Sequence, residues 1–200
     1  MIDRVVLGTR NAGKTRELQI LLQGIAARME SLDAYPGVIL PPEGHESFAE
    51  NARAKARAVS EALGVAAIGD DSGLEVDALG GEPGIRSARY AGELAGDAAN
   101  NALLLERLAG VPPERRKARF RCVLAFEAPG EPGALVEGVC EGAIAEAPRG
   151  TGGFGYDPLF VPNGEARTFA ELPSRAKDAI SHRARAVAAL REALAAGKGR

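Results

Sequence analysis

The sequence contains few aromatic residues, with no tryptophan, three tyrosines and six phenylalanines, so it offers little on which the bases of a nucleic-acid strand could stack. Its formal net charge of −2 also argues against the basic surface that binds a phosphate backbone. No apolar run approaches the roughly 18 residues of a membrane helix, and the N-terminus lacks a signal-peptide core. We therefore expect a cytoplasmic protein whose partners include neither a nucleic-acid polymer nor a membrane.

Cysteine and lysine are also scarce. Cys122 and Cys140 lie in strand-like apolar segments, which is typical of small core residues. Five lysines stand against twenty arginines, so each lysine is a candidate for a specific role. With 200 residues, of which 46% are hydrophobic, the chain can bury a sizeable core. No repeat or linker divides it, so we predict a single two-lobed domain over residues 1–200.

The segment from Ala67 to Tyr90 carries the densest polar pattern. A short apolar run ends in two adjacent acids, Asp70 and Asp71, which Ser72 follows. Neighbouring carboxylates repel each other, so this arrangement gains little in a plain surface loop. A divalent cation or a proton-transfer role would explain it. The alternative is a charged turn after a strand.

The N-terminal region predicts a strand over residues 2–7, a loop over residues 8–13 and then a helix. Leu18, Leu21, Leu22 and Ile25 have helical spacing. Loop amides and a helix N-terminus above a strand form an anion site. The stretch GTRNAGKT fits the phosphate-binding pattern G-x-x-x-x-G-K-[ST], a short pattern that also arises by chance.

The next region predicts a strand at residues 38–40 and a long helix. Ser47 and Glu50 form a capping box, so the helix should start at Phe48. Asn51 and Lys55, four residues apart, share one face of that helix and could point together toward a ligand. Taken alone, Lys55 could equally be a solvated helix residue.

The second half predicts a helix capped by Asp97, a hairpin of strands over residues 119–126 and 135–147, and a glycine-rich motif. This motif reads GTGGFGYDPLF over residues 150–160. Its glycines indicate a backbone that approaches something closely while an aromatic ring lies against it. The alternative is a connection between core strands.

Ordered motifs with matching spacing resemble the inosine/xanthosine triphosphate pyrophosphatase family over residues 5–185. They are Thr9-x-Asn11-x-x-Lys14, Ser47-Phe48-x-Glu50-Asn51-Ala52-x-x-Lys55-Ala56, Asp70-Asp71-Ser72-Gly73-Leu74, Pro83-Gly84-x-x-Ser87-Ala88-Arg89-Tyr90, Gly153-Phe154-Gly155-Tyr156-Asp157-Pro158, Glu171-Leu172, and Lys177 with Ser181-His182-Arg183. Enzymes of this family hydrolyse deaminated purine nucleoside triphosphates, such as ITP, dITP and XTP, to the monophosphate and pyrophosphate. The resemblance implies an α/β fold with a mixed, twisted central sheet flanked by helices, a substrate cleft between two lobes, and a homodimer.

Two other functions remain possible interpretations of the sequence. A P-loop kinase or NTPase would cleave or transfer at the γ-phosphate, whereas the family attacks between the α- and β-phosphates. A nucleotide-binding sensor would retain Lys14 and the Phe154 loop but would have no need for adjacent acids.

The resemblance implies a set of roles at the phosphate end. The substrate's phosphates would be held by loop amides and by the ammonium groups of two lysines, and Ser72 would lie beside them. The phosphate-binding residues are Thr9, Arg10, Asn11, Ala12, Gly13, Lys14 and Lys55. Mg²⁺ would sit on Asp71 and Glu43. Either Asp70 or Asp71 could accept the proton of the attacking water, and the family motif favours Asp71, with Asp70 as a supporting carboxylate.

The resemblance also implies how the base is bound. Phe154 would stack on the purine. The base edge would meet backbone groups and side-chain donors, and Lys177 would lie near the base or the sugar-phosphate. The edge-reading residues are Gly155, Tyr156, Asp157, His182 and Arg183. Donors aimed at the 6-oxo group would be left unpaired by the 6-amino group of ATP, at about 1–3 kcal/mol for each lost partner.

Overall fold

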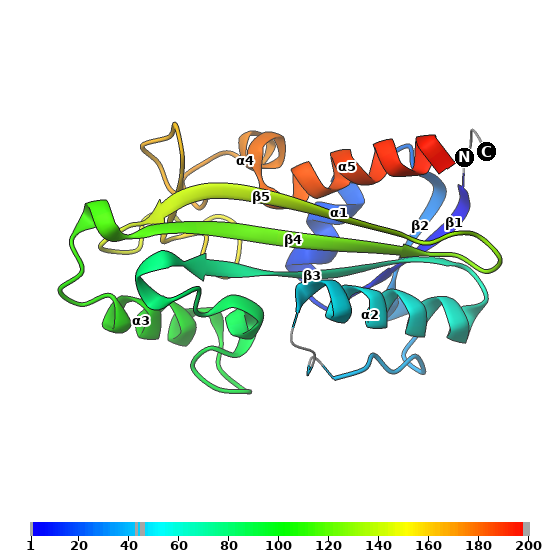
Figure 1. Ribbon diagram of the computed structural model, residues 1–200, viewed down its shortest axis with the longest axis horizontal. Helices are drawn as coiled ribbons and strands as arrows, with labels where there is room; N and C mark the ends of the chain where they lie inside the picture. The colour runs from blue at the N-terminus through cyan, green and yellow to red at the C-terminus, as the bar shows by residue number, and fades with distance from the viewer. Residues whose placement is uncertain (1, 43, 45–46, 198–200) are drawn as a thin grey trace. The chain divides into compact units, whose positions relative to one another are not determined.

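A computed structural model describes residues 2–42, 44 and 47–197 (Figure 1). Helices and strands alternate through the first half of the chain. The strands are β1 (Ile2–Gly8), β2 (Ala26–Ser31), β3 (Ala66–Val76), β4 (Lys117–Glu127), β5 (Ala134–Ile144) and β6 (Phe160–Pro162). The helices are α1 (Ala12–Leu21), α2 (Phe48–Leu63), α3 (Asp97–Arg107), α4 (Ser174–Ile180) and α5 (His182–Gly197). Short 3₁₀ helices are η1 (Leu32–Ala34), η2 (Asp77–Leu79), η3 (Gly84–Arg89) and η4 (Pro113–Arg115).

The strands of the described chain form one six-stranded sheet in the order β2-β1-β3-β4-β5-β6. β1 pairs in parallel with both β2 and β3, whereas β5 and β6 are antiparallel, so the sheet is mixed. β4 and β5 are the expected hairpin (Figure 1). The predicted fold class, a mixed sheet flanked by helices, is confirmed. None of the helices in the described residues is long and apolar enough to cross a membrane.

The chain divides into two compact units. The first comprises Met1–Asp71, Cys122–Gly138 and Arg183–Arg200, and the second comprises Ser72–Arg121 and Val139–His182. The chain passes from one unit to the other at Asp71, Arg121, Gly138 and His182. Two of these crossing points fall at residues that the sequence marks as functional.

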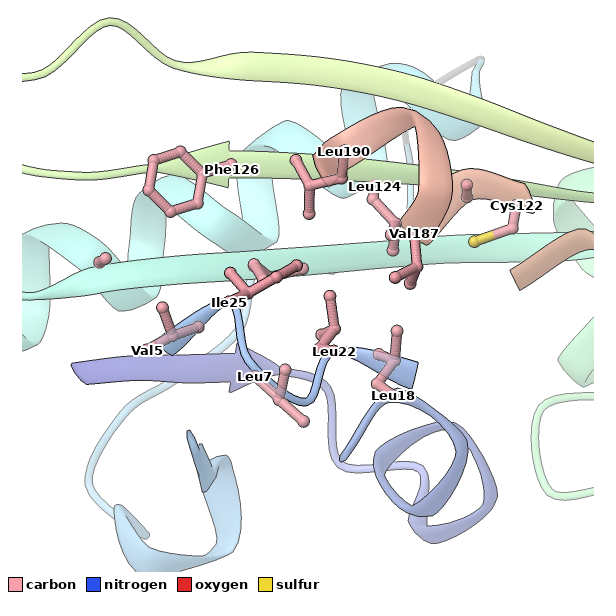
Figure 2. Packing of buried hydrophobic residues seen from close by; sticks show 13 residues of the cluster. Val5, Leu7, Leu18, Leu22, Ile25, Cys122, Leu124, Phe126, Val187 and Leu190 are labelled. Atoms are coloured by element: carbon pink, nitrogen blue, oxygen red, sulfur yellow. The ribbon is translucent and has the colours of Figure 1, made fainter. Parts of the chain in front are cut away.

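The first unit buries a hydrophobic cluster on each face of its part of the sheet. On one face, residues of α1 and α5 pack against β1, β3 and β4 (Figure 2). Residues of α2 and the segment after β2 pack on the other face. Side chains in a strand alternate between faces, and accordingly Ile68 of β3 belongs to the first cluster and Ala67 to the second.

The second unit has one hydrophobic cluster. Leu104 and Leu108, at the C-terminal end of α3, pack there with residues of β3, β4 and β5. Phe120, Phe160 and Phe169 meet within it, with ring centroids 4.7–6.0 Å apart. This cluster supports the segment that carries the glycine-rich motif.

Three sequence expectations for the first half of the chain are wrong. Residues 38–40 form no strand; the edge strand beside β1 is β2, and Val38 is buried in a loop. α1 ends at Leu21, so Ile25 joins the core from the turn beyond the helix. β3 does not end before the acids but runs through both of them to Val76.

The predicted start and end of α2 are confirmed, whereas the predicted cap of α3 is not. Ser47 caps α2 by accepting a hydrogen bond from the Glu50 N–H, and Gly64 ends the helix with φ +65°. For α3, however, the N-cap is Gly96 and not Asp97. The Asp97 carboxylate accepts a hydrogen bond from a different segment, which is described below.

Gly69 controls how closely α2 lies against β3. A Cβ at this position would lie 2.1 Å from the Ala52 carbonyl oxygen and 2.8 Å from the Ala56 nitrogen, both backbone atoms of α2. We expect Gly69→Ala to lower the free energy of unfolding by about 2–3 kcal/mol, because the helix must move outward. Gly37→Ala is the matched control, since its Cβ would meet nothing within 4 Å. Equal midpoints for the two variants in urea denaturation would contradict this close packing.

Candidate functional site

The adjacent acids Asp70 and Asp71 lie within β3 and point to opposite faces of it. Asp70 lies on the same face of β3 as Ile68, which α1 and α5 cover. Asp71 lies on the opposite face, with Ala67 and Gly69, which α2 covers. Their partners come from different helices. The two carboxylates therefore do not form a repelling pair at the tip of a turn, and the charged-turn alternative is wrong.

Asp70 is fully buried and its carboxylate is surrounded by donors. The Lys14 ammonium of α1 lies 2.5 Å from Oδ1, and the Arg183 Nε of α5 lies 3.1 Å from Oδ2. The Cys122 thiol donates to Oδ2 at 3.3 Å. Burial and the charge of Asp70 raise the pKa of this thiol well above its ordinary value, so it stays protonated. Asp70 is an anchor for cationic groups.

Arg183 is 2% exposed and pairs with two carboxylates. Besides Asp70, it forms an ion pair with Glu17 of α1. Burial alone would lower the pKa of the guanidinium, but the charges of Asp70 and Glu17 outweigh it and raise the pKa above the ordinary value. Sequence reasoning missed Glu17. Its signal was the spacing of three residues from Lys14, which puts both on one side of α1.

On the other face of β3, Asp71 accepts hydrogen bonds from two residues of α2. The Lys55 ammonium lies 2.9 Å from Oδ1 and the Asn51 amide nitrogen 3.0 Å from Oδ2. Lys55 also donates to the Asp70 carbonyl at 3.2 Å and is only 5% exposed. The structure therefore excludes the solvated-helix alternative for Lys55, and Asn51 and Lys55 do act from one helix face.

The connection from β1 to α1 consists of Thr9–Asn11 alone. The Asn11 side chain caps α1 by accepting from the Lys14 N–H at 3.0 Å, and Ala12 and Gly13 already belong to the helix. A P-loop needs a longer wrap around the phosphates than this. The connection between β1 and α1 is therefore too short for the P-loop alternative.

Three amides near this connection have no acceptor among the residues described. They are the N–H groups of Arg10, Ala12 and Gly13, which precede or open α1. Free N–H groups at a helix N-terminus favour an anion. The Arg10 side chain is used differently: its guanidinium donates to the Val38 carbonyl at 2.7 Å and so fastens the loop after β2.

In the second unit, the Gly150–Pro158 loop is tied together by Asp157. Its Oδ2 accepts a hydrogen bond from the Phe154 N–H at 2.9 Å and pairs with the Lys177 ammonium of α4. This ammonium also lies 5.0 Å from the Phe154 ring centroid. Gly153, at φ +72°, leaves no room for a Cβ beside Asp157. Phe154, Asp157 and Lys177 are thus brought together as one cluster.

Tyr156 and His182 are buried in the same unit. The Tyr156 hydroxyl donates to the Ser87 carbonyl at 2.9 Å, and burial raises its pKa. The His182 ring stacks on Phe120 with centroids 4.7 Å apart. The Tyr156 side chain therefore anchors the loop, and a ligand could meet this residue through its backbone.

Ser72 and Glu43 are the two remaining residues that the sequence predicts for the site. Ser72, half-buried in β3, is the first residue of the second unit. Glu43, the second expected metal ligand, lies outside the described residues. Within the described ranges, no group of three or more His, Cys, Asp or Glu side chains could hold a metal ion. Any metal there would rely on one or two carboxylates and on other oxygen atoms.

The chain is similar to known proteins over nearly its whole length. The model of the Ham1 family matches residues 5–193. The chain is 51% identical to the dITP/XTP pyrophosphatase of Geobacillus kaustophilus, over all of this chain and 99% of that protein. It is 49% identical to the enzyme of the same name from Geobacter sulfurreducens, over 96% and 97% of the two chains. The solved structure of the Staphylococcus aureus Ham1 protein superimposes with a TM-score of 0.85 at 36% identity, covering 97% of this chain and 99% of that one.

The match therefore extends over nearly the whole chain and includes both units. The Thr9–Lys14 motif, the acids of β3 and the Phe154 loop all fall within it. By its sequence and by its fold, this chain belongs to the Ham1 family.

Proposed function

We propose that the chain hydrolyses deaminated purine nucleoside triphosphates, such as ITP, dITP and XTP, to the monophosphate and pyrophosphate. The relatives at about 50% identity carry the name of this activity. The observation that carries the proposal is that the adjacent acids of β3 each hold a buried lysine, Asp70 holding Lys14 near the N-terminus of α1 and Asp71 holding Lys55 of α2. Two ammonium groups at neighbouring residues of one strand, together with the free amides that open α1, suit a polyanion.

The first unit binds the phosphates in this proposal. A triphosphate carries about four negative charges near neutral pH and needs several donors at once. The N–H groups of Arg10, Ala12 and Gly13 supply neutral donors, and Lys14 and Lys55 supply charge. Because Asp70 and Asp71 already hold both ammonium groups, the lysines are positioned before the substrate arrives. Glu17 and Arg183 support this arrangement through Asp70.

Asp71 is the proposed proton acceptor. A water molecule attacks the α-phosphorus and gives its proton to Asp71, while the bond to the oxygen bridging the α- and β-phosphates breaks and pyrophosphate leaves with the electron pair. Asp70 is less suited to this role because Lys14, Arg183 and Cys122 surround its carboxylate. This ordering agrees with the expectation from the family motif.

Mg²⁺ belongs to the proposal as the cofactor. The Asp71 carboxylate offers the hard oxygen atoms that Mg²⁺ prefers, and such sites commonly combine one or two carboxylates with substrate phosphates and water. Asp71 would hold the ion, with Glu43 as the second ligand that the resemblance implies. When bound, the ion would neutralise charge that develops on the phosphate oxygens. The homodimer that the resemblance implies is part of the same proposal.

Base recognition is assigned to the second unit. Phe154 has the Lys177 ammonium over its ring, and the purine would stack on the other face. His182 and the loop backbone would serve the base edge. The resemblance assigns Arg183 to the base edge as well, but its Nε pairs with Asp70 and its Nη1 with Glu17. We therefore assign Arg183 to the phosphate end.

The product distinguishes this function from its rivals. We expect incubation with Mg²⁺ and dITP or XTP to release pyrophosphate and monophosphate, with much slower release from ATP and none after chelation by EDTA. Pyrophosphate and orthophosphate are assayed separately. Orthophosphate with a nucleoside diphosphate would overturn the proposal and favour a γ-phosphate enzyme. Binding without any release would favour a sensor.

A further inference from the structure

Two residues of α3, Asp97 and Asn101, hold the two peptide groups that flank Gly155. The Asp97 Oδ2 accepts a hydrogen bond from the Gly155 N–H at 2.6 Å. The Asn101 Nδ2 donates to the Gly155 carbonyl at 2.8 Å and to the Asp97 carbonyl at 2.8 Å. Both side chains lie on one face of α3, because they are four residues apart.

At position 155 a glycine depends on these hydrogen bonds for its conformation more than any other residue type would. Its φ of +61° is in the left-handed region, and glycine exchanges freely between this conformation and others. A residue's φ and ψ are the rotations that connect the planar peptide group before it to the one after it. Since Asp97 holds the first group and Asn101 the second, α3 determines the conformation of Gly155.

The peptide group held by Asn101 also contains the Tyr156 N–H. In a trans peptide this N–H points away from the Gly155 carbonyl, and therefore away from Asn101. The N–H groups of Phe154, Gly155 and Asp157 have acceptors in the same unit. That of Tyr156 has none among the residues that the structure describes. Asn101 thus orients the Tyr156 N–H, which is still available to donate to a ligand.

This arrangement lowers stability at Asn101 itself. Its Oδ1 is buried and has no hydrogen-bond partner in the described part of the chain. Turning the amide over would not help, because both the Asp97 and the Gly155 carbonyls would then face an oxygen. A buried unsatisfied acceptor lowers stability, and such groups are retained most often where function requires the contact.

We infer that Asp97 and Asn101 are positioning residues that set base specificity, by fixing the Gly155 conformation so that the Tyr156 N–H is presented to a 6-oxo purine. This inference rests on the proposed function, because it takes the Phe154 loop as the base-binding element. An N–H donor pairs with the 6-oxo group of hypoxanthine or xanthine and meets another donor in adenine. A loop that samples several Gly155 conformations loses this discrimination.

The first measurement concerns the loop alone and needs no activity. In the ligand-free protein, Asp97→Ala should raise the hydrogen-exchange rate of the Gly155 amide by about tenfold or more, because its acceptor is lost. Asp97→Asn retains an acceptor oxygen and should leave the rate near that of the wild type. Unchanged exchange in Asp97→Ala would overturn the inference.

The second measurement concerns the base. Titration calorimetry with IMP and AMP, which cannot release pyrophosphate, gives the ratio of their dissociation constants. Asn101→Leu should reduce the preference for IMP by about tenfold. Asn100→Leu is the matched control: it is also a buried asparagine of α3, but it bonds the Ala88 carbonyl and the Ala91 N–H, so the preference should remain.

The outcomes separate this inference from the proposed function. Equal binding of IMP and AMP by the wild type, or an unchanged preference in Asn101→Leu, would overturn the role of α3. A wild type that prefers IMP, loses this preference in Asn101→Leu, and yet releases no pyrophosphate from dITP would overturn the proposed reaction and support the inference.

Discussion

Replacing Asp71 with asparagine is expected to lower kcat/KM for dITP hydrolysis by about 10³-fold or more. Removal of a general base alone typically reduces rates by roughly 10² to 10⁴, and the same change removes the anionic oxygen that would hold Mg²⁺. An asparagine oxygen can still accept the hydrogen bond from Lys55, and Lys55 keeps its bond to the Asp70 carbonyl. The loss should therefore appear in turnover rather than in folding.

Pyrophosphate release under saturating Mg²⁺ measures the loss, and circular dichroism confirms that the variant is folded. Glu75→Gln is the matched control, because it removes a carboxylate from the same strand. Its side chain pairs with Arg121 in the second unit, and the proposal gives it no role. The assignment of Asp71 fails if Asp71→Asn and Glu75→Gln retain similar turnover.

Replacing Arg183 with methionine is expected to lower the free energy of unfolding by about 3–5 kcal/mol. This is the usual range when one partner of a buried ion pair is removed, since the remaining charge is left in a dry environment. Here the remaining charges are those of Asp70, which is fully buried, and Glu17. Lys14 still neutralises Asp70 in part, so Glu17 and the Oδ2 side of Asp70 account for most of the loss.

Equilibrium unfolding in urea measures this difference. Arg185→Met, an exposed position on the same helix, is the control and should change stability by no more than about 0.5 kcal/mol. Arg183→Lys should recover only part of the stability, because an ammonium cannot reach both carboxylates as the guanidinium does. If Arg183→Met unfolds at the same urea concentration as Arg185→Met, the buried cluster does not stabilise the first unit.

The local signals in the sequence predicted the elements that depend on neighbouring residues. The capping box at Ser47 and the glycine at position 64 set both ends of α2, because caps satisfy backbone groups within a few residues. The strand predicted at residues 2–7 and the hairpin of β4 and β5 were recognisable from apolar runs and turn residues. The motifs also identified Lys14, Lys55, Asp157 and Lys177 before their contacts were known.

Elements that depend on distant partners were predicted less well. The edge strand beside β1 is β2, whose residues show no clear alternation of burial, while the apolar residues 38–40 form a loop in which only Val38 is buried. Asp97 looked like a helix cap, but its carboxylate serves the Gly155 amide, 58 residues away in the sequence. No local pattern contains such a contact.

The sequence by itself determined which residues are the candidates for the chemistry, since the acids, the lysines and the glycine-rich loop all follow from residue type and spacing. Only the tertiary structure decided what each acid does. Because β3 continues through Asp70 and Asp71, alternation in the strand turns them to opposite faces. One carboxylate meets α1 and α5 and anchors Lys14 and Arg183, and the other meets α2 and holds Lys55. Adjacent residues of the same type thus differ in role because helices distant in sequence cover the two faces of one strand.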